Sequence, residues 1–159
     1  MYYSFKGILS SVRKDFVVIE VGGIGFQVFV PHIDDYHQNE EVFIYVQQVV
    51  REDEQYLVGF KTEYEKEAFL SLISVKGIGP RTALGAMSAT TAEELLNAIA
   101  ANNITFLKKL PGIGAKAAAQ IILDLKGQLT GSPSGNPNQY DEVRDALKGL
   151  GYKIKEIEN

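Results

Sequence analysis

The stretches "VKGIGPRTA" (residues 75–83) and "LPGIGAKAA" (residues 110–118) repeat one pattern 35 residues apart. Each copy lies between two stretches whose apolar residues recur with the spacing of a helix. Aligning the copies pairs two glycines, one isoleucine and one base: Gly77 with Gly112, Ile78 with Ile113, Gly79 with Gly114, and Arg81 with Lys116. Helical solenoids of such a period stack about three or more units, whereas this chain has two. The repeat therefore predicts two helix–turn–helix units in one helical domain.

The chemistry of these turns favours a phosphate ligand. Glycine lets a ligand approach the backbone closely, and the N–H groups that begin the following helix carry the positive end of its dipole. Arg81 and Lys116 are placed to add a charge-assisted contact. Ile78 and Ile113 are expected to turn inward and anchor each turn. Because backbone amides would meet a phosphate, we expect these turns to hold a nucleic-acid backbone without reading its bases.

A simpler interpretation is that each GIG ends one helix and starts the next, since glycine is common at helix ends. Two copies with matched bases and matched isoleucines favour the phosphate site instead. This pair is the helix-hairpin-helix motif of many DNA-handling proteins, and a tandem pair predicts duplex DNA bound through its backbone. The predicted phosphate-binding residues are Gly77, Ile78, Gly79, Arg81, Gly112, Ile113, Gly114 and Lys116.

Residues 1–62 have a β-sheet pattern. Five short runs rich in β-branched and aromatic residues are separated by turn signals: "SFKGILSSV", "DFVVIEV", "GFQVFV", "EEVFIYVQQVV" and "QYLVGF". Five strands in a segment of this length predict a small barrel, and the OB-fold is the leading candidate. Gly22 and Gly23 fit a tight turn better than a phosphate-binding loop, because no helix follows them.

The rest of the chain is predicted to be helical, which makes the fold class multidomain α+β. Residues 63–129 hold the tandem helix-hairpin-helix domain, with capping-box spacing at Thr62–Glu65 and Thr91–Glu94. Residues 130–139, "TGSPSGNPNQ", are predicted to be a flexible linker. Residues 140–159 fit one amphipathic helix and the start of another, which is too little chain to bury a core alone.

Composition limits the class of protein. The 159 residues include no cysteine, so neither a disulfide framework nor a thiolate metal site is available, and a reducing cytoplasm is the expected compartment. No apolar run approaches the roughly 20 residues of a membrane helix. No Walker-type phosphate loop is present, so we expect no ATP hydrolysis by this chain and no cofactor. His32 and His37 lie in a turn-rich stretch that is interpreted as a solvated loop rather than a metal site.

The net charge of −4 argues against unselective binding of nucleic acid, but the charge is unevenly distributed. Residues 1–62 hold nine acidic against five basic residues, whereas residues 63–130 hold six against seven. Any polyanion contact should therefore fall in the helical segment.

Three adjacent acids, Glu52, Asp53 and Glu54, lie at the expected tip of a hairpin in the acidic half. A solvated turn is the simplest interpretation. A metal-dependent, structure-specific nuclease is an alternative, but its carboxylates must converge from separated positions, whereas adjacent ones diverge. A single-strand-binding OB module is a second alternative. It needs aromatic platforms in a basic groove, whereas the predicted barrel segment is acidic.

The order of these predicted elements along the chain resembles that of the RuvA family, the Holliday-junction-binding subunit of the bacterial branch-migration complex. The elements are a barrel, an acidic hairpin, two helix-hairpin-helix motifs, a linker and a tail. The resemblance covers nearly the whole chain, and its most specific strings are "KGILSSV", "IEVGGIGFQV", "VVREDEQYLVGF", "LISVKGIGPRTAL" and "LPGIGAKAAAQIILDLK". It implies a fourfold-symmetric homotetramer, alone or as two stacked tetramers. The barrels would meet at the centre of an open, square-planar four-way junction, and the helical domains would follow its arms.

The resemblance also implies roles for particular residues. An acidic pin at the crossover matches Glu52 and Asp53 here. Family members often have two adjacent bases after the second GIG, whereas this chain has Ala115 before Lys116, so Lys108 or Lys109 could supply a missing contact. The family has no catalytic residues of its own: the hexameric RuvB motor hydrolyses ATP during recombination and DNA repair, and the RuvC resolvase cuts the junction. Residues 140–159 match the opening of the motor-binding module, which we expect to be incomplete here.

Overall fold

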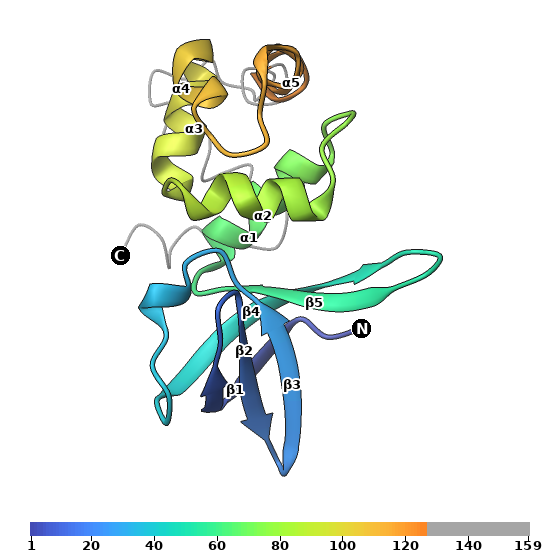
Figure 1. The fold of residues 1–159 in the computed structure, drawn as a ribbon, viewed down its shortest axis with the longest axis vertical. Coiled ribbons are helices and arrows are strands. Elements are labelled where there is room, and N and C mark those ends of the chain that lie inside the picture. The colour runs from blue at the N-terminus through green and yellow to red at the C-terminus, as the bar shows by residue number, and fades with distance from the viewer. Residues whose placement is uncertain (127–159) are drawn as a thin grey trace, which may run out of the picture. The chain divides into compact units, whose positions relative to one another are not determined.

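The computed structural model describes residues 1–126 of the chain (Figure 1). It divides into two compact units, Met1–Lys66 and Glu67–Asn159, and the second is described as far as residue 126. The linker predicted at residues 130–139 and the tail module predicted at residues 140–159 lie outside the described residues. Each unit is considered by itself below.

The first unit contains a closed five-stranded barrel, which confirms the OB-like prediction (Figure 1). Around the barrel the strands follow the order β1-β2-β3-β5-β4, and β4 returns to pair with β1. All neighbours are antiparallel except β3 and β5, which run parallel. The strands are β1 (Ser4–Val12), β2 (Phe16–Val21), β3 (Ile24–Phe29), β4 (Glu41–Val50) and β5 (Gln55–Phe60).

Alternation of apolar residues explains why these strands close around a core. Along β4, Val42, Ile44 and Val46 are buried, whereas their neighbours are more exposed, as expected when successive side chains point to opposite faces. Gly59 is required inside the barrel, because a Cβ there would lie 2.5 Å from a methyl carbon of Val28. The barrel core consists of Phe5, Leu9, Val17, Ile19, Val28, Val30, Tyr36, Val42, Ile44 and Val46.

The glycine pair between β2 and β3 forms a tight hairpin turn. Gly22 and Gly23 have φ values of +58° and +86°, and the strands pair right up to Val21 and Ile24 on either side. A two-residue turn with positive φ at both positions matches the right-handed twist of the flanking strands. These glycines therefore have a structural role in the barrel.

The second unit is helical in its described part, as predicted. The helices are α1 (Glu63–Ile73), which begins in the first unit, α2 (Pro80–Ser88), α3 (Ala92–Ala100), α4 (Ile104–Lys108) and α5 (Ala115–Ile121). After α5 the chain continues as a π-helical turn over Ile122–Lys126. Buried apolar residues from every helix and both glycine turns form the core, including Phe69, Leu72, Val75, Ile78, Met87, Leu95, Ile99, Leu107, Leu110, Ile113, Ile121 and Leu125.

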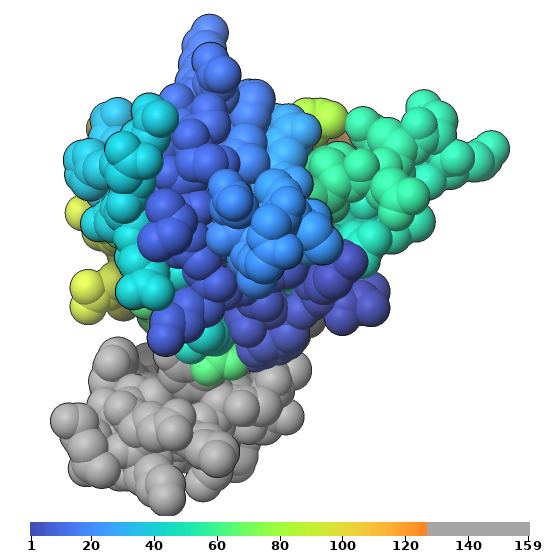
Figure 2. Space-filling view, turned by 90° about the horizontal axis from the view of Figure 1, so that it is seen from below, coloured from blue at the N-terminus to red at the C-terminus, as the bar shows by residue number. Residues whose placement is uncertain are grey.

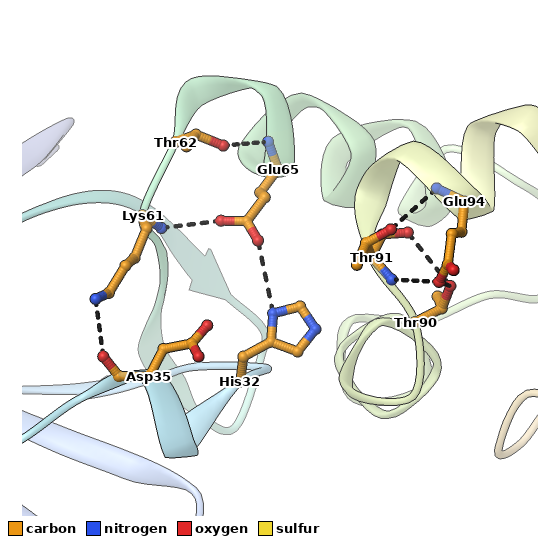
Figure 3. A network of polar contacts seen from close by, with 8 residues as sticks. All are labelled: His32, Asp35, Lys61, Thr62, Glu65, Thr90, Thr91 and Glu94. Carbon is orange, nitrogen blue, oxygen red and sulfur yellow. Dashed lines mark hydrogen bonds and ion pairs between the residues drawn. The ribbon is translucent and has the colours of Figure 1, made fainter.

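The capping box predicted at Thr91–Glu94 forms in full, whereas the one at Thr62–Glu65 forms only its first bond (Figure 3). The Thr91 hydroxyl accepts the Glu94 N–H at 3.1 Å, while the Glu94 carboxylate accepts the Thr91 N–H at 3.4 Å. At α1, the Thr62 hydroxyl likewise accepts the Glu65 N–H at 3.1 Å. The carboxylate of Glu65 instead accepts the N–H of Lys61, one residue before the cap. At both starts a threonine hydroxyl satisfies an N–H group that the helix leaves without a partner.

The loop between β3 and β4 is fixed to the start of α1 within the first unit. His32 precedes the short 3-10 helix Ile33–Asp35, and its Nδ1 lies 3.5 Å from the second carboxylate oxygen of Glu65 (Figure 3). Tyr36, which directly follows the 3-10 helix, is buried, and burial together with the nearby Glu65 raises the pKa of its hydroxyl. The stretch interpreted as a solvated loop is thus partly an ordered connection to α1.

Among residues 1–126, no helix has the length and apolar character needed to span a membrane.

Candidate nucleic-acid interface

The first glycine turn joins α1 to α2. Its isoleucine, Ile78, is buried, and the Ile78 N–H donates to the Val75 carbonyl at 3.0 Å. Gly79 is the N-cap of α2, Pro80 follows at the first helical position, and no side chain caps the helix start. Proline suits this position because its missing N–H would have had no intrahelical partner. Arg81 is exposed in the first turn of α2.

The second glycine turn joins α4 to α5 and repeats this geometry. Ile113 is buried, and its N–H donates to the Leu110 carbonyl at 3.1 Å. Gly114 is the N-cap of α5, again without a side-chain cap, and Lys116 is exposed in the first turn. The first helical bond also recurs, because the N–H four residues beyond each N-cap glycine donates to that glycine at 2.9 Å. The two isoleucines thus anchor the turns as the sequence predicted.

The two glycines of each turn have different reasons to be glycine. Gly77 and Gly112 have φ values of +92° and +78°, a left-handed backbone that other residues adopt at a cost. Gly79 and Gly114 have extended backbone with φ near −93° and −94°, which any residue adopts. A Cβ on either one would meet no protein atom within 4 Å. The fold itself does not demand glycine at these two N-caps, and the missing side chain leaves open space at each helix start.

The two turns share one surface of the second unit. A methyl of Thr82, in α2, would lie 3.3 Å from a Cβ on Gly112, so the second turn is close to the helix that follows the first. A pocket of about 630 Å³ spans both turns. It is lined by Lys76, Gly77, Gly114, Ala115, Lys116, Ala117 and Gln120. Residues from both copies of the repeat, including two lysines, therefore converge on one concave site.

Sequence comparison of the two turns did not single out Lys76 or Gln120. Lys76 aligns with Pro111 in the second copy, so it has no matching base there. Gln120 belongs to α5, one turn beyond Lys116, and carries no charge that marks it. A search along the first copy alone for a base next to GIG would have found Lys76. Lys108 and Lys109, the suggested substitutes for a second base, are exposed but do not line this pocket.

The acidic stretch forms the tip of the β4–β5 hairpin. Val50 pairs with Gln55, and the Arg51 N–H donates to the Glu54 carbonyl at 2.8 Å, which closes the turn. All four residues of the turn are exposed, including Glu52 and Asp53. The hairpin extends well beyond the body of the barrel, as Figures 1 and 2 show. The acids are therefore held at the end of a projecting, regularly paired ribbon.

Comparison with known proteins covers both units. A family model described as RuvA N terminal domain matches residues 1–59, and one described as SAM-like helix-hairpin-helix tandem matches residues 69–126. Curated relatives carry the name Holliday junction branch migration complex subunit RuvA. The protein of Streptococcus sanguinis (strain SK36) is 43% identical over 99% of this chain and 86% of its own length. The proteins of Streptococcus gordonii and Streptococcus suis (strain 05ZYH33) are each 41% identical over the same shares. With such identity along nearly the entire chain, and with both of its units matched, this protein belongs to the RuvA family.

Proposed function

We propose that this protein binds four-way (Holliday) DNA junctions without reading their sequence, holds them open and square-planar, and supports ATP-driven branch migration by a partner motor in recombination and DNA repair. The observation that carries the proposal is the matched pair of glycine turns. Both present an uncapped helix start, an N-cap glycine with open space around it and an exposed base on one surface.

Each turn is proposed to hold one stretch of DNA backbone. Uncapped N–H groups and the positive end of a helix dipole attract a phosphate, and an N-cap without a Cβ lets it come close. Gly77, Ile78 and Gly79 form the first site with Arg81. The second site consists of Gly112, Ile113, Gly114 and Lys116. Contacts of this kind fix the register of a duplex but carry no base information.

Glu52 and Asp53 are proposed as a pin that repels DNA from the junction centre. A phosphate about 4 Å from a carboxylate experiences a repulsion of about 1 kcal/mol when both are fully in water, and more where protein excludes the water. Four pins around a fourfold axis would multiply this term where an intact duplex would have to cross the centre. An open junction keeps its phosphates away from that point. Repulsion of the wrong substrate then adds to attraction of the right one, and the same pins are proposed to help part base pairs as the arms move.

The proposed assembly is a homotetramer, either one or two stacked on a junction, that works in the cytoplasm. Its partners are the hexameric RuvB motor, which hydrolyses the ATP, and the RuvC resolvase. The chain itself is proposed to be a non-catalytic subunit. We further propose the domain division of residues 1–62, 63–129, 130–139 and 140–159 as barrel, DNA-binding domain, linker and motor-binding module.

Neither alternative function gains support from a specific observation. A nuclease would need converging metal ligands, and residues 1–126 contain no group of three acids or histidines that could hold a metal ion. A single-strand-binding barrel would need exposed aromatic platforms. Tyr2, Tyr3 and Phe43 are about half exposed on the barrel. Such platforms work beside a basic groove, whereas residues 1–62 hold nine acidic against five basic residues.

The decisive experiment compares three DNA substrates of matched sequence: a synthetic four-way junction, a linear duplex and a single strand. We expect the junction to bind most tightly in gel-shift titrations at fixed salt. Light scattering of the free and junction-bound protein should give the mass of a tetramer or of two tetramers. Equal affinity for junction and duplex, or a monomer in both states, would overturn the proposal.

A further inference from the structure

Asp124 connects the two hairpins of the repeat. It lies in the π-helical turn that follows α5, and its side chain is partly buried. One carboxylate oxygen accepts the backbone N–H of Lys76 at 3.3 Å. The other accepts the Nε2–H of Gln120 at 2.9 Å. A single side chain from the end of the second hairpin therefore holds the backbone of the first glycine turn.

Both partners of Asp124 line the pocket shared by the two turns. Lys76 comes from the first turn and Gln120 from α5, so the carboxylate fixes one pocket wall from each hairpin. Since Asp124 accepts the backbone N–H of Lys76, the ammonium group of that residue is not engaged by this bond. The bond fixes the backbone of Lys76, which lines the pocket together with Gly77 and Lys116.

The π-helical turn contributes to this arrangement. A π-helical turn holds more residues than an α-helical turn, and such turns occur often at functional sites. The turn begins at Ile122, directly after α5, and contains Asp124. Leu125 in the same turn is buried in the helical core, so the turn is anchored while Asp124 meets the first hairpin.

We propose that Asp124 is a positioning residue for DNA binding, which fixes the first hairpin against the second so that both grip one duplex and Lys76 adds a phosphate contact in the pocket between them. The inference rests on the proposed function. Electrostatics alone predicts the opposite sign for this residue, because a carboxylate beside a phosphate site weakens anion binding. Removing the charge should therefore strengthen DNA binding if Asp124 is only a nearby charge, and weaken it if Asp124 positions the hairpins.

The experiment measures duplex and junction affinity of Asp124→Ala and Asp124→Asn over a salt series by fluorescence anisotropy. We expect Asp124→Ala to bind both substrates on the order of tenfold more weakly, as for the loss of hydrogen bonds to a charged group. The salt dependence should flatten, because fewer phosphates are engaged at once. Asp124→Asn keeps one acceptor oxygen and should lose less. Glu93→Gln removes an exposed acid in α3, outside the pocket, and should bind as tightly as the unmodified protein or slightly more tightly.

A double variant separates positioning from general loss of stability. If Asp124 acts by joining the two sites, Asp124→Ala should cost less in a Lys116→Ala background, where the second site is already weakened. Circular dichroism at the assay temperature checks that each protein is folded, and Asp124→Asn carries the test if Asp124→Ala is not. If a folded Asp124 variant binds DNA as tightly as the unmodified protein, or more tightly, the inference is overturned. Failure of the unmodified protein to bind any DNA would instead overturn the proposed function.

Discussion

Ile78 and Ile113 occupy equivalent places in two turns of the same unit: each is buried between two glycines, and each N–H donates to the carbonyl three residues earlier, at 3.0 Å and 3.1 Å. The repeat in the sequence is thus also a repeat in hydrogen bonding and packing. The buried isoleucine holds each turn from within, and the N-cap glycine that follows it begins the next helix without a side-chain cap.

The two isoleucines are predicted to stabilise the fold rather than to touch DNA. Ile78→Ala and Ile113→Ala should each lower the free energy of unfolding by about 2 to 4 kcal/mol, the usual effect of removing a buried isoleucine side chain. Urea denaturation of each variant measures this loss. Ile104→Ala is a matched control, because Ile104 in α4 is 39% exposed and should lose much less. A loss no larger than the control would contradict the anchoring role.

The N-cap glycines are predicted to separate binding from stability. Gly79→Ala and Gly114→Ala should leave the free energy of unfolding within about 1 kcal/mol, because their backbone is extended and their Cβ positions are open. They should nevertheless weaken duplex binding by about fivefold or more, since a methyl group would lie where a phosphate approaches. Paired denaturation and anisotropy titrations test both halves.

The other glycine of each turn provides the contrast. Gly77→Ala and Gly112→Ala should be destabilised by about 1 to 2 kcal/mol, because both positions have positive φ. If all four glycine variants lost stability alike and bound DNA in proportion to that loss, clearance for a phosphate would not be the reason for glycine at the N-caps.

Local sequence patterns predicted the barrel and the turns because alternation, glycine pairs and capping residues act between near neighbours. The π-helical turn was missed, since the apolar period runs from α5 into residues 122–126 without a visible break. The contact of Asp124 with Lys76 was also missed. It joins residues far apart in the chain through a backbone N–H, which carries no signal of residue type. The loop sequence around His32 does not predict its contact with Glu65, because Glu65 lies in α1.

The bases are predicted to contribute affinity without selectivity. Arg81→Ala and Lys116→Ala should each weaken binding to four-way junctions and to linear duplexes of any sequence alike. The expected loss is about 1 kcal/mol of binding free energy, which is roughly fivefold in affinity. The slope of log affinity against log salt concentration should become less steep by about the amount that one phosphate contact contributes. Lys14→Ala serves as the comparison, because Lys14 is exposed between β1 and β2 and does not line the shared pocket. An effect confined to one DNA sequence would contradict backbone recognition.

The acidic tip is predicted to select substrates by repulsion. Glu52→Gln combined with Asp53→Asn should raise affinity for linear duplex about fivefold or more, while junction affinity changes less, because only the duplex must place phosphates near the tip. Both residues are exposed at the end of a paired hairpin, so the fold should tolerate the change. The control combines Glu20→Gln with Glu41→Gln, two exposed acids on β2 and at the other end of β4, and so removes the same number of negative charges. Gel-shift competition between junction and duplex gives the ratio directly. If the double variant and the control shift that ratio equally, net charge explains discrimination and the position of the acids does not. If only the variant of Glu52 and Asp53 shifts it, the hairpin acts through where it holds its charge, since both proteins lose the same net charge.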